Sequence, residues 1–276
     1  MKRKSPWISL IIIAIIAISA IFKIDILGEL GLSDQPQKQK QTITRSNNAP
    51  LSNAVDQTVY KKLASKNYQS GEAPYIEVNN GQSNLDIRKW KENRVIYGNL
   101  DKWNRTTYVT AFIDRKNLGK SKGRDRQIWQ PTGWHQKEID GMPIYNRGHL
   151  LAYTSSFNFD QDGNYKTGEQ GSIDNPKNLA TQSQFSNQHT QTYFENKVRN
   201  AQAIRGNKVI YQIVTVFRGQ EKMPRGYWLQ AVDSKGTLHF NVYNWNVQPG
   251  IVFNYATGTS KVAKQMKVST DNHLAE

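Results

Sequence analysis

The sequence predicts an α+β fold in which a central antiparallel sheet is flanked by helices. Two observations lead to this prediction. Short stretches rich in β-branched and aromatic residues recur between turn residues, and one long stretch carries apolar residues at helical spacing. The chain has 276 residues, of which 37% are hydrophobic and 11% aromatic. That is enough apolar material for a sizeable core, and we expect one large folded domain.

The predicted strands are β-branched and aromatic, with partial alternation of apolar and polar positions. They cover residues 75–82, 106–115, 208–219, 227–232 and 238–247. The turn sequence DSKGT joins the last two strands as a hairpin. The predicted helix lies within 176–204, where NPKN supplies turn chemistry and Gly206 closes the element.

Residues 1–23 have the composition of an export signal. A basic start, MKRK, precedes the apolar run 7–22, which reads WISLIIIAIIAISAIF. This run is shorter than the ~20 residues that span a bilayer, and it is typical of the apolar part of a signal peptide. Ile18 stands where a small residue is preferred before cleavage. Two alternatives therefore stay open, a cleaved signal peptide and an uncleaved membrane anchor, and either one places the rest of the chain outside the membrane.

Composition divides the rest of the chain into three segments. Residues 24–71 are rich in Gln, Asn, Ser and Lys and predict a flexible polar linker. Residues 72–256 hold the predicted strands and helix and form the folded domain, and 257–276 are a polar tail that we expect to be loose. The chain has no cysteine, which excludes disulfides, zinc–thiolate sites and cysteine nucleophiles.

The chain is strongly basic. It has 37 Lys and Arg against 22 Asp and Glu, a formal net charge of +15. Residues 1–23 contain four basic residues and no acid, so the exported part keeps 33 basic against 22 acidic residues and a net charge of +11. Such an excess predicts attraction to polyanions such as nucleic acid, anionic lipid or wall polymers. The alternative is a basic surface without a specific partner.

One histidine lies in a segment with unusual chemistry, NRGH at residues 146–149. Hydrolysis of a phosphodiester needs a base for the attacking water and a cation for the developing charge. The ordinary pKa of histidine, about 6.5, suits His149 to the first task at neutral pH. Mg²⁺ takes oxygen ligands and keeps several waters, so the amide oxygen of Asn187 could be its only protein ligand.

The predicted helix carries four polar residues at intervals of four: Asn187, Gln191, Glu195 and Arg199. Neighbours at this spacing lie on one face of an α-helix. On that face Glu195 could orient Asn187 and accept hydrogen bonds from the waters of a metal ion. A solvated polar face with one Glu195–Arg199 pair is the alternative, and such a pair is worth only a few tenths of a kcal/mol.

Four ordered segments carry a resemblance to a known family. They read GRDRQIW at 123–129, NRGHLLAY at 146–153, NPKNLATQSQFSNQ at 175–188 and YFENKVR at 193–199. Together they resemble the DNA/RNA non-specific endonucleases, the ββα-metal nucleases. The likeness is closest to the secreted or membrane-attached DNases of Gram-positive bacteria, and it extends over roughly 75–255. The resemblance implies a ββα-metal motif at the site.

The resemblance also implies roles for single residues. His149 matches the family's general base, Asn187 the metal-ligating asparagine, and Glu195 the acid that supports the hydrated metal. Asn178 matches a further asparagine at the site. Asn146 departs from the family pattern, since aspartate is the commoner residue there, and this substitution removes a charge near His149.

Arginine and lysine residues complete the implied site. Arg126 matches the arginine that stabilises the transition state, and Arg124 its phosphate-binding neighbour. Lys122 belongs to the same basic run, which begins at Lys116. Arg147 and Arg199 are the other two residues that we expect to bind nucleic acid.

The sequence therefore predicts an exported endonuclease without sequence specificity. We expect Mg²⁺ as the cofactor, with Mn²⁺ as a substitute, and double- or single-stranded DNA or RNA as the substrate. The resemblance implies products with 5′-phosphates, and no obligate protein partner is evident. The alternative is a surface-tethered protein that binds nucleic acid without cutting it; it explains the charge but not the combination of His149, Asn187 and Glu195.

Overall fold

The computed structural model describes residues 54–122, 125–139 and 141–270, all of which belong to one compact unit. The predicted signal or anchor at 1–23, the part of the predicted linker before residue 54, and Arg124 lie outside the described residues. Within the described ranges, the structure has no helix that is long and apolar enough to cross a bilayer.

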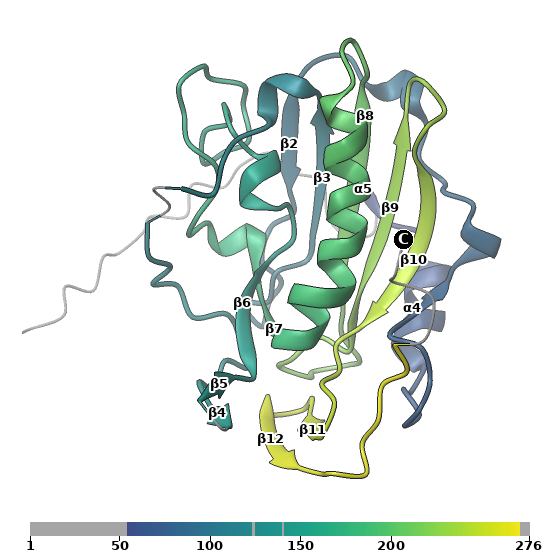
Figure 1. Cartoon of the computed structure of the whole chain (residues 1–276), viewed down its shortest axis with the longest axis vertical. Helices are drawn as coiled ribbons and strands as arrows, with labels where there is room; N and C mark the ends of the chain where they lie inside the picture. The colour runs from purple at the N-terminus through teal and green to yellow at the C-terminus, as the bar shows by residue number, and fades with distance from the viewer. Residues whose placement is uncertain (1–53, 123–124, 140, 271–276) are drawn as a thin grey trace, which may run out of the picture. The chain divides into compact units, whose positions relative to one another are not determined.

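A six-stranded antiparallel sheet forms the centre of the unit, which confirms the predicted α+β class (Figure 1). Its strand order is β1-β10-β9-β8-β3-β2. The strands are β1 (Tyr75–Glu77), β2 (Arg94–Tyr97), β3 (Tyr108–Ile113), β8 (Val209–Val216), β9 (Gly226–Asp233) and β10 (His239–Trp245). The five predicted strands are all present, and β2 is the strand that the sequence pattern did not reveal.

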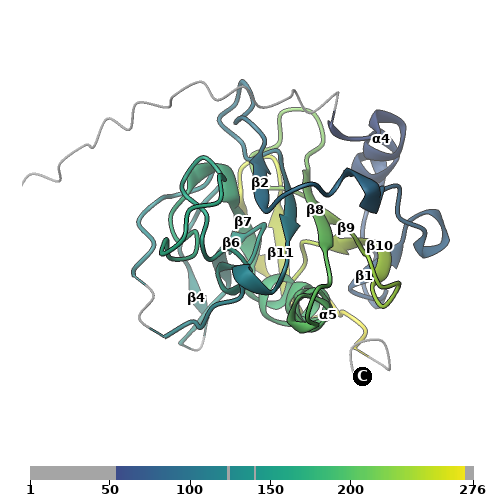
Figure 2. The same ribbon diagram turned by 90° about the horizontal axis from the view of Figure 1, so that it is seen from above.

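Helices cover both faces of this sheet (Figure 2). Helix α5 (Thr192–Ala203) lies on one face, where Phe194 and Val198 pack against alternate residues of the sheet such as Tyr211. Helix α4 (Gln57–Ser65) lies on the other face and buries Leu63 in a second apolar cluster. Because successive side chains of a strand point to opposite faces, the same strands supply both clusters.

A second strand pair adjoins helix α5. Strand β6 (Tyr145–His149) pairs in antiparallel fashion with β7 (Leu179–Ser183), and the π-helical turn η6 (Ser186–Gln191) leads from β7 into α5. The order β6, β7, α5 is a ββα unit, which confirms the predicted motif. The predicted helix at 176–204 was wrong over its first part, because 179–183 form β7 and bury all five side chains between β6 and the rest of the domain.

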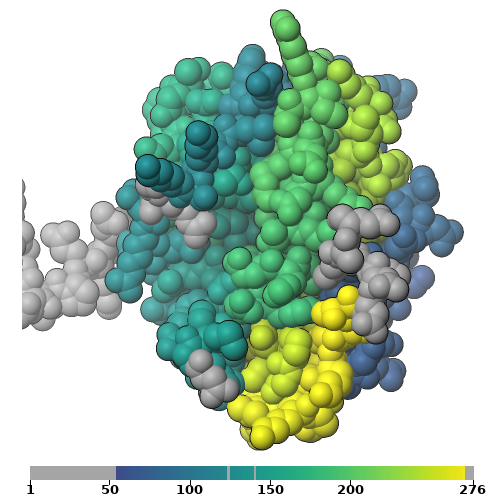
Figure 3. All heavy atoms as spheres, viewed as in Figure 1, coloured from purple at the N-terminus to yellow at the C-terminus, as the bar shows by residue number. Residues whose placement is uncertain are grey.

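Two segments expected to be loose contain regular structure. Helix α4 lies inside the predicted linker 24–71, where the side chain of Asp56 accepts hydrogen bonds from the first turn and apolar residues on one face are buried. In the predicted tail, β12 (Thr259–Val262) pairs with β11 (Ile251–Asn254), and Met266 packs on the second apolar cluster. Figure 3 shows the yellow C-terminal residues at the surface below the green helix α5. A short pair, β4 (Glu138–Ile139) and β5 (Met142–Pro143), completes the strands.

The packing of α5 on the sheet gives a testable prediction. Phe194 is 3% exposed and contacts the rings of Tyr75 and Phe240, with centroids 5.0 and 5.1 Å away. We expect Phe194→Ala to lower the free energy of unfolding by about 3–5 kcal/mol, because it leaves a cavity between helix and sheet. Urea denaturation measures the change. The control Val252→Ala, on a residue 49% exposed, should change it by less than about 0.5 kcal/mol.

Candidate active site

A pocket of about 440 Å³ opens between β6, the turn η6 and helix α5. It brings together six of the residues singled out from the sequence. Around it lie Gln127, Trp134, Gln136, Pro143, Tyr145, Asn146, Arg147, His149, Ala152, Tyr153, Thr154, Asn187, Gln188, Thr192, Glu195 and Arg199. Most of these side chains are polar, and two of them, Arg147 and Arg199, carry a positive charge at neutral pH.

His149 ends strand β6 and is 8% exposed. Its Nε2 atom lies 2.9 Å from the backbone oxygen of Ile173. A carbonyl oxygen only accepts hydrogen bonds, so Nε2 carries the ring hydrogen. In the neutral ring Nδ1 is then the basic nitrogen, which fixes the atom through which His149 can take a proton.

Asn187 lies in the π-helical turn η6 at the edge of the pocket. Its Nδ2 donates to Oε1 of Gln182 over 3.0 Å, and its Oδ1 accepts from Nδ2 of Asn146 over 3.0 Å. An exposed side chain, Gln188, also donates to Oδ1. The side-chain amide of Asn146 is therefore bonded to Asn187, the candidate metal ligand.

Glu195 lies two turns further along and is largely buried, with 13% of its side chain exposed. Burial raises its pKa from the ordinary 4.5 to about 7, although a hydrogen bond from Gln191 and the charge of Arg199 act in the opposite direction. The carboxylate lies 3.7 Å from a guanidinium nitrogen of Arg199. The carboxyl group therefore lies at the pocket wall, where it can accept hydrogen bonds, and it gains or loses its proton near neutral pH.

Arg147 and Arg199 supply the positive charge of the pocket. The guanidinium of Arg147 lies 4.6 Å from the ring centroid of Trp134, which holds it in place by a cation–π contact. Its Nε is buried without a hydrogen-bond partner in the structure. Both arginines have guanidinium N–H donors that suit phosphate oxygens, and their contact with nucleic acid stays a prediction.

The structure places Asn178 behind the pocket and not in it. Its side chain is fully buried, and its amide accepts from the backbone N–H of Leu151 over 2.9 Å and donates to the backbone oxygen of Leu151 over 3.0 Å. Asn178 therefore holds the chain two residues after His149. This arrangement makes it a positioning residue.

Arg126 and Lys122 are exposed and do not line the pocket. The segment of Arg126 is nevertheless fixed at the pocket's edge. The side chain of Gln127 donates to the backbone oxygens of Arg147 and Ile173 over 3.2 and 3.3 Å. The segment 172–174 thus supports both His149 and the neighbour of Arg126.

Asp174 provides the second attachment of this arginine segment. Its Oδ1 accepts from the backbone N–H groups of Ile128 and Trp129 over 3.1 and 2.8 Å. Sequence reasoning missed the roles of Asp174, Gln182 and Gln191, because each of them bonds residues that belong to another element of the fold. The only local signal was the four-residue spacing that includes Gln191.

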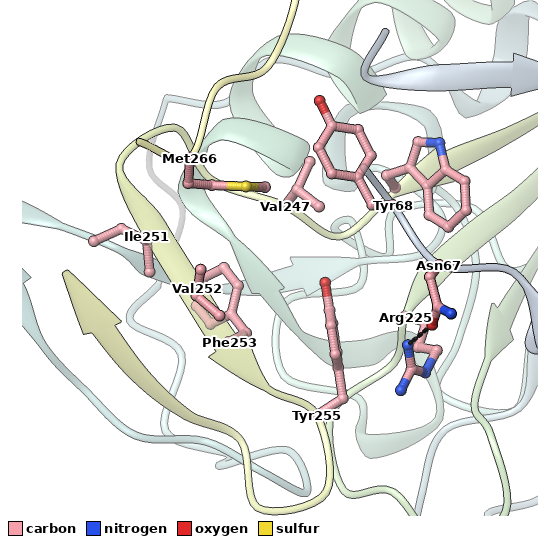
Figure 4. Close-up of a pocket in the computed structure, with 10 residues that line it drawn as sticks. Asn67, Tyr68, Arg225, Val247, Ile251, Val252, Phe253, Tyr255 and Met266 are labelled. Atoms are coloured by element: carbon pink, nitrogen blue, oxygen red, sulfur yellow. Dashed lines mark hydrogen bonds between the residues drawn. The ribbon is translucent and has the colours of Figure 1, made fainter. Parts of the chain in front are cut away.

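A second cavity, of about 180 Å³, differs in chemistry from the first (Figure 4). Tyr255, Phe253 and Met266 are among its mainly apolar walls, and Arg225 donates to Asn67 at one side. No histidine or acid is among the described residues that line it. The histidine and the carboxyl group that suit acid–base chemistry at neutral pH thus lie in the first pocket.

Oxygen ligands for a cation in the first pocket come from few residues. Within the described ranges, no group of three or more His, Cys, Asp or Glu residues could hold a metal. The amide oxygen of Asn187 is the one candidate ligand from our sequence analysis that lies in the pocket, and Glu195 can accept hydrogen bonds from water around a cation.

Comparison with known proteins identifies the family. A sequence model of the DNA/RNA non-specific endonucleases matches residues 70–262. The chain belongs to this family. Membership in the non-specific endonucleases, which the four sequence segments had indicated, is thereby confirmed, and it makes the chain a nuclease of the hydrolase class.

Solved structures of other nucleases share the fold. NucA from Streptococcus agalactiae with a magnesium ion bound is 29% identical, with a TM-score of 0.62 over 74% of this chain and 94% of NucA. NucA with no metal bound is 28% identical, with a TM-score of 0.60 and the same coverage. The Sda1 nuclease with a bound zinc ion has 18% identity and a TM-score of 0.54 over 69% of this chain and 97% of its own, a likeness of fold alone.

The attachment of the arginine segment can be tested through Asp174. We expect Asp174→Ala to free the backbone N–H groups of Ile128 and Trp129, because their shared acceptor is lost. Asp174→Asn keeps an oxygen and is the matched control. Hydrogen exchange at the amides of 128 and 129 should accelerate at least about tenfold in the alanine variant, the equivalent of one net hydrogen bond of roughly 1.4 kcal/mol. Equal exchange in Asp174→Ala and wild type would contradict this attachment.

The raised pKa of Glu195 predicts a pH-dependent stability. A carboxyl whose folded-state pKa is above its unfolded value stabilises the fold below the unfolded pKa, and this stabilisation is lost as pH rises to the folded value. The loss should fall between about pH 4.5 and 7 and amount to roughly 3 kcal/mol, at about 1.4 kcal/mol per pKa unit. Glu195→Gln removes this ionisation. Urea unfolding in EDTA measures the free energy of unfolding of the variant and the wild type at pH 4.5 and pH 8. We expect the difference, variant minus wild type, to be larger at pH 8, and an equal difference at both pH values would disprove the shift.

Proposed function

We propose that this chain is an exported, metal-dependent endonuclease that hydrolyses DNA or RNA without sequence specificity. One observation carries the proposal. The basic Nδ1 of His149 and the amide oxygen of Asn187 belong to the same polar pocket, each oriented by a hydrogen bond on its other side. A general base and a cation ligand at one site are the two requirements of phosphodiester hydrolysis.

Mg²⁺ fits the residues around this pocket, and Mn²⁺ is a suitable substitute. Asn187 would hold the ion through Oδ1, whose partner Gln188 is an exposed side chain able to move away. The related NucA has a structure with magnesium bound, which supports this choice. When bound, such an ion supplies positive charge that stabilises the developing phosphorane and the leaving oxygen.

The side chains of the chain itself account for the other parts of the reaction. His149 takes the proton of the attacking water at Nδ1 while Nε2 stays bonded to Ile173. Arg147 and Arg199 hold phosphate oxygens in the pocket, and Arg126 approaches from the segment attached through Gln127. Glu195 accepts hydrogen bonds from water, and Asn178 keeps the chain after His149 in position. Release of the 3′-oxygen leaves a 5′-phosphate on the product.

The lack of sequence specificity follows from what the pocket offers. Its arginines and amides suit phosphate and sugar oxygens, which are the same for every base. The net charge of +11 after residue 23 supports binding to polyanions of either sugar type. Residues 1–23 would direct the domain outside the cell, either released after cleavage or tethered through 7–22.

A second candidate function, binding without cleavage, is less well supported. It gives no reason for a histidine whose tautomer is fixed beside an oriented amide oxygen. A plasmid assay separates the two functions, since only an enzyme converts supercoiled plasmid to nicked circles.

We expect the purified full chain to nick plasmid with Mg²⁺ or Mn²⁺ and to stop when EDTA is added. His149→Ala should lower the rate about 10²–10⁴-fold, because a positioned base contributes that much. DNA ligase should reseal the nicks, which requires a 5′-phosphate. The matched control is His189→Ala, an exposed histidine that stacks on Phe185 and does not line the pocket. Undiminished cleavage by His149→Ala, or none by wild type with either metal, would sink the proposal.

A further inference from the structure

A chain of buried amides connects the backbone of His149 to the side chain of Asn187. We infer that Gln191 and Gln182 are positioning residues that set the direction of the Asn187 amide, so that its oxygen and not its nitrogen faces the cation. The inference rests on the proposed role of Asn187 as the metal ligand. Each step follows from which atoms can donate and which can only accept.

The chain starts at Gln191, whose orientation is fixed by two acceptors. Its Nε2 donates to the backbone oxygen of His149 over 2.6 Å and to Oε1 of Glu195 over 2.9 Å. If this amide turned over, its oxygen would face the backbone oxygen of His149 with no hydrogen between them. Backbone geometry therefore determines where Oε1 of Gln191 points, whatever occupies the pocket.

Gln182 transmits this direction to the edge of the pocket. Its Nε2 donates to Oε1 of Gln191 over 2.9 Å and to the hydroxyl of Ser186 over 3.0 Å. Both of its donor hydrogens are thus used, and its Oε1 lies on the opposite side. That oxygen accepts from Nδ2 of Asn187 over 3.0 Å, so the last amide has its oxygen towards Asn146 and the pocket.

Burial makes the arrangement all-or-none. Gln182 and Gln191 are fully buried, and a buried amide that loses a partner costs about 1–3 kcal/mol. Reversing one amide would break bonds at both of its ends, so the three amides hold their orientation together. A free Asn187 would turn its N–H groups towards a cation in part of the molecules, which weakens binding.

The sequence makes room for this chain at Gly148. A Cβ atom at that position would collide with the side chain of Gln182, both at its amide oxygen and at its Cβ. The glycine of NRGH therefore lets Gln182 lie across strand β6, between His149 and Asn187. This explains a glycine whose backbone has no positive φ.

Substitutions of Gln182 in the full chain test the inference. Gln182→Met removes every hydrogen bond of this amide at similar length. Gln182→Glu, which full burial favours in its protonated form, keeps an oxygen that accepts from Asn187 and an O–H that donates to Gln191. We expect Gln182→Met to weaken Mn²⁺ binding about 10–100-fold, the usual loss when support of a metal ligand is removed, and Gln182→Glu to retain most of the affinity. Titration followed by the EPR signal of free Mn²⁺ measures binding without relying on activity.

Two controls make the outcomes decisive. Gln202→Met changes a fully buried glutamine of α5 that donates to the backbone of Asp114, outside the amide chain, and should bind Mn²⁺ as wild type does. Asn187→Ala should lose binding, and normal binding by this variant would overturn the proposed metal site together with the inference. If Asn187→Ala loses Mn²⁺ binding and Gln182→Met binds Mn²⁺ as wild type does, the inference is overturned but the proposed metal site is not.

A direct measurement covers the case in which Gln182→Met does not fold. In the wild-type chain, the side-chain amide hydrogens of Gln182, Gln191 and Asn187 should exchange slowly with solvent in NMR spectra, because all three are bonded. Fast exchange of the Asn187 amide would overturn the inference.

Discussion

The antiparallel pairing of β6 with β7 is the constraint on which the site depends. Its register sets His149 opposite Leu179 and Asn146 opposite Gln182. Because β7 runs directly into η6, the same register determines where Asn187 starts the helical part of the site. A slip of one residue would turn every side chain of β6 to the other face, so one ladder positions both the proposed base and the proposed metal ligand.

The π-helical turn explains why the predicted helical face is only partly realised. Four-residue steps from Asn187 to Arg199 assume 3.6 residues per turn throughout. A wider turn at Ser186–Gln191 shifts this phase, so that Gln191 is buried against the backbone of His149 while Asn187, Glu195 and Arg199 line the pocket. Single π turns occur often at functional sites, and no residue type in the sequence signals one.

More of the fold than of the detailed site could be predicted from the sequence. Runs of β-branched and aromatic residues predicted the long strands, because helices cover both faces of the sheet and every side chain of β8 and β9 is buried. The pattern failed at 179–183, LATQS, because the last three residues of this short strand are polar and are buried by pairing and hydrogen bonds. The pocket residues His149, Asn187 and Glu195 came from spacing and resemblance, but the burial of Asn178 and the exposure of Arg126 depend on long-range packing that no local pattern contains.

Two independent supports converge on His149, and they divide the work of the site. From one side, Gln191 bonds the backbone oxygen of His149, and Gln182 links Gln191 to Asn187, the proposed metal ligand. From the other side, Ile173 bonds its ring and shares with Gln127 the attachment of the arginine segment. The first support is buried and rigid, so it suits an ion that needs fixed ligand geometry. The second lies in a connection between elements, and loops of this kind can adjust to a substrate backbone whose sequence varies. This arrangement suits a nuclease that accepts any sequence. The reacting groups keep a fixed geometry, while the loop that contacts nucleic acid can adjust its position.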